Sequence, residues 1–188
     1  MKGSLKARSS GGFCMDNLEE ALRLEVRRKI YGTVQQNPGL HFREIQRRVG
    51  IATGALQYHL DYLGKKHLVR SEKDAKFLRY YLVREEFKDT QLMGLLRQGS
   101  MRKIIVFLMQ RRFANNVTIS NAVGLSPSTT SWHVEKLSGA GILSGRKHGR
   151  KSYYSLADKD RVAQLLVGYK ASFLDEMVDN FVEVWEEI

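Results

Sequence analysis

Two short segments, whose aromatic residues Tyr58 and Trp132 lie 74 positions apart, carry side chains that hydrogen-bond and stack at the start of what their spacing predicts to be helices. The first runs from Thr53 to Tyr58 and the second from Ser128 to Trp132. Each segment offers hydroxyl or amide groups and then a large aromatic ring. Such groups, on the exposed start of a helix, read base edges or bind phosphates in a nucleic-acid groove.

A basic segment follows each of these predicted helices. Lys73, Lys76 and Arg79 follow the first helix, and a denser run from Arg146 to Lys151 follows the second. Cations on an exposed hairpin bind the DNA backbone or the minor groove and give an affinity that depends on salt. The second run is the stronger candidate, because few acidic residues lie near it in the sequence.

An internal repeat sets the size of the elements that position these groups. The offset of 74 residues holds without a gap from Arg28 and Arg102 to Leu82 and Leu156. A repeat defines the folding unit, which here is about 55 residues long and occurs twice. We therefore expect two small domains rather than one large domain.

The order of elements within a copy is that of a winged helix-turn-helix. In the first copy, helical spacing ends near Gln36, a short helix places Ile45 and Val49 inward, and Gly50-Ile51 makes a tight turn. A second helix over 53–63 and two strands over 69–72 and 77–83 follow. The second copy repeats this order: a helix over 102–113, a short element over 117–123, a helix opened by Ser126-Pro127, and strands over 142–145 and 152–156.

The predicted fold is mainly α with small β-hairpin wings: two tandem winged helix-turn-helix domains plus a long C-terminal helix. The expected parts are a flexible N-terminal arm over 1–16, domain 1 over 17–83, a linker helix over 84–100, domain 2 over 101–157 and the C-terminal helix over 158–188. A capping box of Asn17 and Glu20 predicts that the first helix of domain 1 starts at Asn17 and continues to Gln36.

The C-terminal segment carries apolar residues every three or four positions, in a stripe broader than packing on one helix requires. One interpretation is that the stripe covers the cores of the two domains. The other, which we favour, is a homodimer interface formed by Leu166, Tyr169, Phe173, Met177, Phe181, Val184 and Trp185.

Charge and composition narrow the function classes. The chain has 188 residues and a net charge of +11; residues 28–82 contribute +7, residues 101–156 contribute +8 and residues 157–188 contribute −5. Positive charge concentrated in repeated modules is typical of a protein that binds a polyanion. No apolar run is long enough to span a bilayer. With one cysteine, Cys14, and histidines that lack metal-ligand spacing, we expect no disulfide, no metal site and no cofactor. No catalytic motif is present, so we expect no enzyme.

The candidate DNA-binding residues follow from these elements. On the recognition helices they are Thr53, Gly54, Gln57, Tyr58, Ser128, Thr129, Ser131 and Trp132, and on the wings and backbone-facing surfaces they are Arg43, Arg47, Lys73, Lys76, Arg79, Arg146, Lys147, Arg150 and Lys151. For the two aromatic rings, contact with the groove wall and packing on the adjacent wing both stay open. The histidines that follow them, His59 and His133, are expected to pack within the helices with one ring nitrogen hydrogen-bonded.

The segments 37–47, 53–60 and 125–134 resemble a known group. They are similar to archaeal transcriptional regulators with two tandem winged-helix domains, related to the ArsR/MarR-type regulators. The similarity covers about residues 17–156. It implies sequence-preferring DNA binding, commonly as a dimer. The chain lacks the cysteine pair of metal-sensing members, so no metal response is expected.

The predicted function is a transcriptional regulator that binds double-stranded DNA, as a homodimer, in the cytoplasm at the nucleoid. A small-molecule effector is possible on this reading, but its identity is open. The alternatives are a tandem winged-helix scaffold that binds proteins, and a DNA-repair or chromatin-associated DNA-binding protein.

Overall fold

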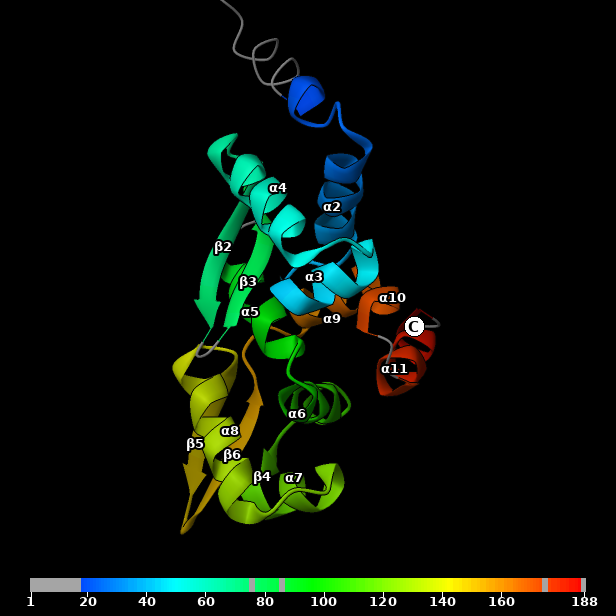
Figure 1. Ribbon diagram of the computed structural model, residues 1–188. Helices are drawn as coiled ribbons and strands as arrows, with labels where there is room; N and C mark the ends of the chain where they lie inside the picture. The colour runs from blue at the N-terminus through cyan, green and yellow to red at the C-terminus, as the bar shows by residue number, and fades with distance from the viewer. Residues whose placement is uncertain (1–17, 75–76, 85–86, 174–175, 187–188) are drawn as a thin grey trace, which may run out of the picture. The chain divides into compact units, whose positions relative to one another are not determined.

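The computed structural model describes residues 18–74, 77–84, 87–173 and 176–186 (Figure 1). These residues form two compact units; unit 1 ends at Arg84, and unit 2 begins at residue 85. Each unit is organised around a helix-turn-helix and a three-stranded sheet.

Unit 1 contains α2 (Glu25–Gln36), β1 (Leu40–His41), α3 (Phe42–Val49), α4 (Thr53–Lys65), β2 (Val69–Asp74) and β3 (Phe77–Leu82). Its antiparallel sheet has the order β1-β3-β2. Helix α4 packs against α2 and β2 (Figure 1). Apolar residues of all six elements, such as Ile30, Ile45 and Leu60, meet in one core.

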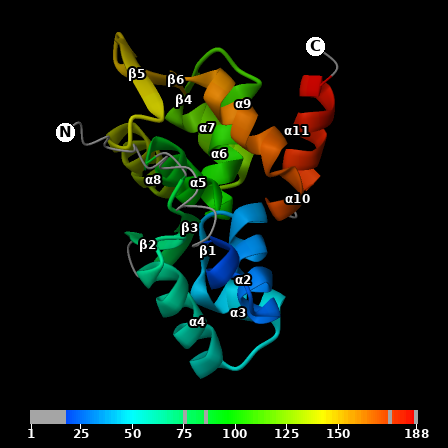
Figure 2. The same ribbon diagram turned by 90° about the horizontal axis from the view of Figure 1, so that it is seen from above.

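Unit 2 repeats this arrangement and adds helices at both ends. Its elements are α5 (Phe87–Leu96), α6 (Gly99–Met109), β4 (Ala114–Asn115), α7 (Asn116–Val123), α8 (Pro127–Gly139), β5 (Leu143–His148), β6 (Lys151–Leu156), α9 (Lys159–Gly168), α10 (Lys170–Phe173) and α11 (Glu176–Glu186). The sheet order is β4-β6-β5, and α11 packs on α9 and α6 (Figure 2).

The predicted repeat is confirmed element by element. The bounds of α7, α8, β5 and β6 equal those of α3, α4, β2 and β3 shifted by 74 residues. The strand register repeats as well, because Val69 pairs with Leu82 and Leu143 pairs with Leu156. Strands β1 and β4 were not predicted, since a strand of two residues has no sequence period.

The turns between the short helix and the recognition helix use glycine in both units. Gly50 and Gly124 end α3 and α7 with φ values of 76° and 69°, in the left-handed region that favours glycine. In unit 2 the predicted cap is also present: Ser126 accepts a hydrogen bond from the Thr129 amide, and Pro127 opens α8.

Two predicted helices are interrupted. Residues 18–21 are helical, but the chain leaves the helix at 22–24 and α2 starts only at Glu25, because Leu24 has extended backbone and is half exposed. The proposed capping residue Asn17 lies outside the described residues. The single C-terminal helix expected over 158–188 is instead three helices, and α9 ends at Gly168, a residue of low helix propensity.

The segments on either side of the second copy of the repeat pack within unit 2. Leu92 and Leu96 of α5, from the segment expected to be a linker helix, are buried, and α5 packs on α6 and α9. At the other end, Lys159 Nζ donates to the carbonyl oxygens of Met109 and Arg111, both at 2.9 Å. Unit 2 therefore extends beyond its helix-turn-helix at both ends of the sequence it covers.

One core position of unit 2 departs from the repeat and gives a stability prediction. Thr130 takes the place of Leu56 and is fully buried, and its hydroxyl has no hydrogen-bond partner among the described residues. Thr130→Val keeps the shape and removes the unsatisfied hydroxyl, so we expect a gain of about 1 kcal/mol in the free energy of unfolding.

Urea unfolding followed by tryptophan fluorescence measures this gain, because Trp132 and Trp185 both lie in unit 2. Thr129→Val, at an exposed neighbouring position, is the control and is expected to change stability by less than about 0.5 kcal/mol. A loss of stability in the Thr130 variant would contradict the prediction.

Candidate nucleic-acid interface

Helix α4 presents an exposed face at its start. The helical period places Leu56, Leu60 and Leu63 on one face of α4, and all three are buried. The opposite face leaves the four predicted contact residues of this helix exposed: Thr53, Gly54, Gln57 and Tyr58. The helix is thus anchored by its leucines and offers its first turns to a partner.

Hydrogen bonds hold the side chains at this helix tip. Gln46 Nε2 donates to Thr53 Oγ1 at 2.9 Å and to the Ile51 carbonyl oxygen at 3.3 Å, which ties α3 to the start of α4. Gln57 Nε2 donates to Asp61 Oδ1 at 2.8 Å. Because the amide nitrogen of Gln57 carries two hydrogens, the bond to Asp61 still leaves one donor for bidentate pairing with an adenine. Sequence reasoning missed Gln46, because a residue that only orients another has no signal of its own.

The tip of α8 carries a cluster of hydroxyls. Ser128, Thr129 and Ser131 are exposed, as predicted for contact residues. Ser126 Oγ lies 3.0 Å from Ser128 Oγ and 2.8 Å from Thr129 Oγ1. Asn116 Nδ2, from α7, donates to Ser131 Oγ. These linked hydroxyls are suited to phosphate and water-mediated contacts rather than to a sharp base code.

Large aromatic rings stand at equivalent places on the two helices. Tyr58 is 62% exposed and Trp132 is 57% exposed. Each ring lies edge-on to the histidine that follows it, with centroids 5.2 Å and 5.0 Å apart. Exposure of this size argues against close packing of either ring on its wing.

Each of these rings is followed by a histidine with one buried ring nitrogen. The Nδ1 atoms of His59 and His133 are buried, and neither has a hydrogen-bond partner among the described residues. Nδ1 is therefore not the hydrogen-bonded ring nitrogen that was expected in either histidine. Burial lowers the pKa of both imidazoles, and the positive charges of Arg27 near His59 and Lys136 near His133 lower the pKa further.

These shifts predict a loss of stability in mild acid. A histidine whose pKa is lower in the folded state binds its proton more tightly when unfolded. Stability is therefore full above about pH 6.5, the usual histidine pKa, and falls as the pH drops towards the lower folded values.

We expect the urea midpoint to fall between pH 7.5 and pH 5.5, and the fall to be smaller in the double variant His59→Gln, His133→Gln. The exposed His148→Gln variant serves as the control and should match the unmodified protein. Equal pH dependence in the double variant would contradict the assignment.

The hairpin β5–β6, which we call wing 2, is cationic and exposed. Residues 144–151 are all exposed, including Arg146, Lys147, Arg150 and Lys151. Residues 143–156 contain no aspartate or glutamate. The charges of wing 2 are therefore not neutralised from within the hairpin, and they are available to an anionic partner.

The corresponding hairpin β2–β3, wing 1, is largely neutralised from within. Arg70 Nε lies 3.4 Å from Glu72 Oε1, and Arg79 Nε lies 2.7 Å from Asp74 Oδ2. Lys73 is exposed, as predicted, whereas Lys76 lies outside the described residues. Wing 1 is thus a weaker anion-binding element than wing 2.

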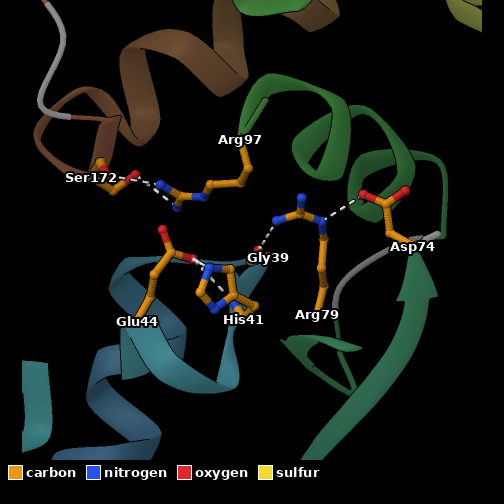
Figure 3. Close-up of polar contacts among 7 residues, drawn as sticks. All are labelled: Gly39, His41, Glu44, Asp74, Arg79, Arg97 and Ser172. Carbon is orange, nitrogen blue, oxygen red and sulfur yellow. Dashed lines mark hydrogen bonds and ion pairs between the residues drawn. The ribbon is translucent and has the colours of Figure 1, made fainter. Parts of the chain in front are cut away.

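Arg79 is not the exposed wing cation that its charge suggested. Its side chain is 6% exposed, and besides the bond to Asp74 it donates from Nη1 to the Gly39 carbonyl oxygen at 2.9 Å (Figure 3). In the same region, His41 pairs with Arg79 in the β1–β3 ladder, and its amide donates to Glu44 Oε2. Arg79 therefore joins the two edges of the sheet, and its assignment to the DNA-contacting set is corrected.

Helix α3 adds positive charge beside α4. Arg43 and Arg47, both predicted to contact the backbone, are exposed. They lie on the face opposite Ile45 and Val49, which are buried. Cations on the first helix of a helix-turn-helix are placed to contact phosphates where that helix crosses the backbone.

The C-terminal helices bury part of the apolar stripe within the chain. Leu166, Phe173 and Phe181 are buried, and Tyr169 and Trp185 are partly exposed. Arg97 of the segment after α5 donates to the carbonyl oxygen of Ser172 at 2.7 Å and to its hydroxyl at 3.0 Å (Figure 3). The side chains of Met177 and Val184 lie outside the described residues. The stripe therefore serves at least partly as a cover for unit 2.

Other kinds of site find no support in the part of the chain that the structure describes. Within it, no group of three or more histidine, cysteine, aspartate or glutamate side chains is arranged to hold a metal ion. None of its helices combines the length and the apolar character that a membrane crossing needs.

Two family models match the chain. Residues 24–91 match an N-terminal helix-turn-helix (HTH) domain, and residues 99–144 match the winged helix-turn-helix DNA-binding domain. The two matches contain α3–α4 and α7–α8, the helix pairs described above.

Curated relatives carry the same type of domain. An HTH-type transcriptional regulator of Methanocaldococcus jannaschii is 28% identical over 136 residues, which are 72% of this chain and 34% of the relative. An HTH-type transcriptional regulator of Bacillus subtilis is 36% identical over 70 residues, which are 37% of this chain and 31% of the relative. The chain spans about a third of the length of these curated relatives.

Among solved structures, that of the AntR antimony-specific transcriptional repressor aligns with a TM-score of 0.40 and 20% identity. The alignment covers 43% of this chain and 73% of the repressor chain, a similarity too low to bear on function. The family matches and the two folded units agree: the chain carries two winged helix-turn-helix domains in tandem.

Proposed function

We propose that this chain is a transcriptional regulator that binds double-stranded DNA through both helix-turn-helix units. Helices α4 and α8 enter the major groove, and the wings contact the backbone or the minor groove. The observation that carries the proposal is wing 2, which combines four exposed cations and no carboxylate, in the same unit as the exposed tip of α8.

The proposed contacts fall into two classes. Base edges and groove walls are contacted by Thr53, Gly54, Gln57, Tyr58 and Trp132, whereas the hydroxyls of Ser128, Thr129 and Ser131 make phosphate and water-mediated contacts. Phosphates are contacted by Arg43, Arg47, Lys73, Lys76, Arg146, Lys147, Arg150 and Lys151. The family match of residues 99–144 to a DNA-binding domain and the names of the two regulators support this assignment.

Salt dependence of binding tests the proposal. Fluorescence anisotropy with a labelled duplex of mixed sequence should show log K falling linearly with log salt, with a slope of about −4 or steeper if wing 2 and further cations bind phosphates. Binding that is unchanged between 50 and 200 mM salt, or that is absent at 50 mM, would refute it.

Genome-wide footprinting then separates a regulator from a DNA-repair or chromatin protein that uses the same surface. A regulator that works in the cytoplasm, at the nucleoid, protects a limited set of sites near transcription starts. Uniform coverage of the genome would favour the chromatin alternative. The proposal includes no catalytic step and no cofactor.

One observation favours a protein partner for unit 1. Wing 1 pairs its acids with its own arginines and leaves Phe77 and Leu78 about half exposed. Apolar residues on a neutralised hairpin fit a protein partner better than a phosphate backbone. If the double variant Phe77→Ser, Leu78→Ser weakens DNA binding as much as loss of the wing 2 cations, this second function is excluded.

We also propose that the chain forms a homodimer through its C-terminal helices. A groove of about 540 Å³ between α9 and α11 is lined by Asp160, Ala163, Gln164, Val167, Gly168 and the partly exposed Trp185. Self-association would cover the exposed part of the apolar stripe. Light scattering after size exclusion should show a dimer for the unmodified chain and a monomer for Trp185→Glu; a monomer for both refutes the proposal.

A further inference from the structure

A groove beside wing 2 combines positive charge with an exposed aromatic ring. It has a volume of about 600 Å³, within the range of small-molecule sites, and lies between β5–β6 and the residues before β4. Its lining includes Arg112, Arg146, Lys147 and His148, and no carboxylate among the described residues lines it. The groove therefore favours an anion.

The aromatic part of the lining is a pair of rings. Phe113 lies edge-to-face with Tyr153, with centroids 5.7 Å apart and an angle of 89° between the planes. Phe113 is nonetheless 57% exposed. A ring held in place by a second ring, with more than half of its surface open, is a surface on which a planar group can stack.

The residues that line this groove differ from those at the equivalent positions of unit 1. The unit 1 positions equivalent to Phe113, Arg146 and His148 are Gly39, Glu72 and Asp74. At the position of Tyr153, unit 1 has Arg79, whose guanidinium binds both Gly39 and Asp74. At these positions unit 1 has groups that hydrogen-bond to one another, whereas unit 2 has cations and an aromatic pair around the groove.

We propose that this groove binds a free nucleoside phosphate, with the phosphate between Arg112, Arg146 and Lys147 and the base stacked on Phe113. Because Arg146 and Lys147 also belong to the proposed DNA-binding surface, the bound nucleotide competes with DNA for wing 2. This second part, the regulation of DNA binding, rests on the proposed function; binding of the nucleotide itself does not.

Calorimetric titration with adenosine monophosphate (AMP), adenosine and inorganic phosphate at 50 mM salt tests the binding step. AMP should bind, and adenosine and phosphate should each bind at least tenfold more weakly, because each lacks one of the two groups that the groove recognises. Phosphate that binds as tightly as AMP would reveal a nonspecific anion site, and no AMP binding at millimolar concentration would likewise overturn the proposal.

Matched variants locate the site. Phe113→Ala should weaken AMP about fivefold or more, as loss of stacking on one ring predicts, and Phe77→Ala, an exposed phenylalanine of unit 1, should leave it unchanged. Arg146→Glu, which places the unit 1 residue in unit 2, should abolish AMP binding. The double variant Arg150→Gln, Lys151→Gln removes wing cations that do not line the groove and should keep AMP affinity within about twofold. Equal losses in the variants and their controls would overturn the site.

Competition tests the regulatory step. AMP should release labelled duplex from the unmodified chain, and Phe113→Ala, whose wing cations are intact, should need an AMP concentration about fivefold or more higher for the same release. If AMP binds and DNA stays bound, the regulatory part is overturned. If the duplex does not bind even without AMP, the proposed function fails, and the calorimetric result still decides the nucleotide site.

Discussion

Replacing the four cations of wing 2 is expected to weaken DNA binding about a thousandfold at 0.1 M salt. The variant carries Arg146→Gln, Lys147→Gln, Arg150→Gln and Lys151→Gln. Each phosphate contact contributes through the release of condensed counterions, at about 0.9 units of slope in log K against log salt. Four lost contacts therefore also lower the magnitude of that slope by about 4.

The fold should tolerate this change. Residues 143–156 contain no acidic side chain that would lose a partner within the hairpin, and all four positions are exposed. Thermal unfolding of the variant should match that of the unmodified protein. A loss of affinity with an unchanged melting temperature assigns the effect to binding and not to folding.

A second variant with the same net charge is the control. Arg28→Gln, Lys29→Gln, Lys65→Gln and Lys103→Gln remove four exposed cations outside the proposed contact set. Long-range attraction alone should cost this variant less than about tenfold, because salt screens charges beyond a Debye length of about 10 Å. Anisotropy titrations at 50, 100 and 200 mM salt compare the two; equal losses would show that net charge, and not wing 2, determines the affinity.

How far the fold could be predicted depended on whether a feature repeats. The 74-residue offset determined α3, α4, β2, β3 and their second copies, because apolar residues such as Ile45 and Leu63 recur in register with the same period. The C-terminal segment lacked such a check. Its apolar period continues past Gly168, so periodicity alone could not show where α9 ends.

The exposed part of the candidate site was also within reach of the sequence. Helical period places Thr53, Tyr58 and Trp132 away from the buried faces of their helices, and the structure finds all three exposed. The hydrogen bonds that orient the site residues could not be predicted from the sequence. Gln46 and Asn116 reach across the turn to the recognition helices, and such contacts depend on tertiary geometry that no local pattern encodes.

Arg79 shows most clearly where a prediction from charge alone fails. In the sequence Arg79 is one of four cations in a predicted hairpin, and it looks as suited to contact DNA as Lys73 does. The pairing of β3 between β1 and β2 places it in the central strand, where its guanidinium meets Asp74 on one side and the Gly39 carbonyl on the other. Strand order, which the sequence does not state, decides that Arg79 is structural and Lys73 is exposed.

Loss of this guanidinium should destabilise unit 1 strongly. We expect Arg79→Met to lower the free energy of unfolding by about 2–3 kcal/mol, because a buried charged hydrogen-bond donor with two partners is replaced by a group with none. The estimate is below the largest values for buried ion pairs because Asp74 remains a quarter exposed, with 26% of its side-chain surface accessible. Arg79→Lys should have a free energy of unfolding between those of the unmodified protein and Arg79→Met. An ammonium keeps the charge but cannot reproduce the planar fork that binds both partners.

Hydrogen exchange of the amides over 40–74 and 77–82 is the appropriate measurement, because both tryptophans lie in unit 2 and do not report on unit 1. Lys73→Met, in the same hairpin but exposed, is the matched control and should change stability by less than about 0.5 kcal/mol. If Arg79→Met and Lys73→Met have the same small effect on exchange, and both weaken DNA binding, Arg79 is a DNA contact after all. If only Arg79→Met accelerates exchange, the residue stabilises the sheet that supports α4, and any loss of DNA affinity follows from loss of that support.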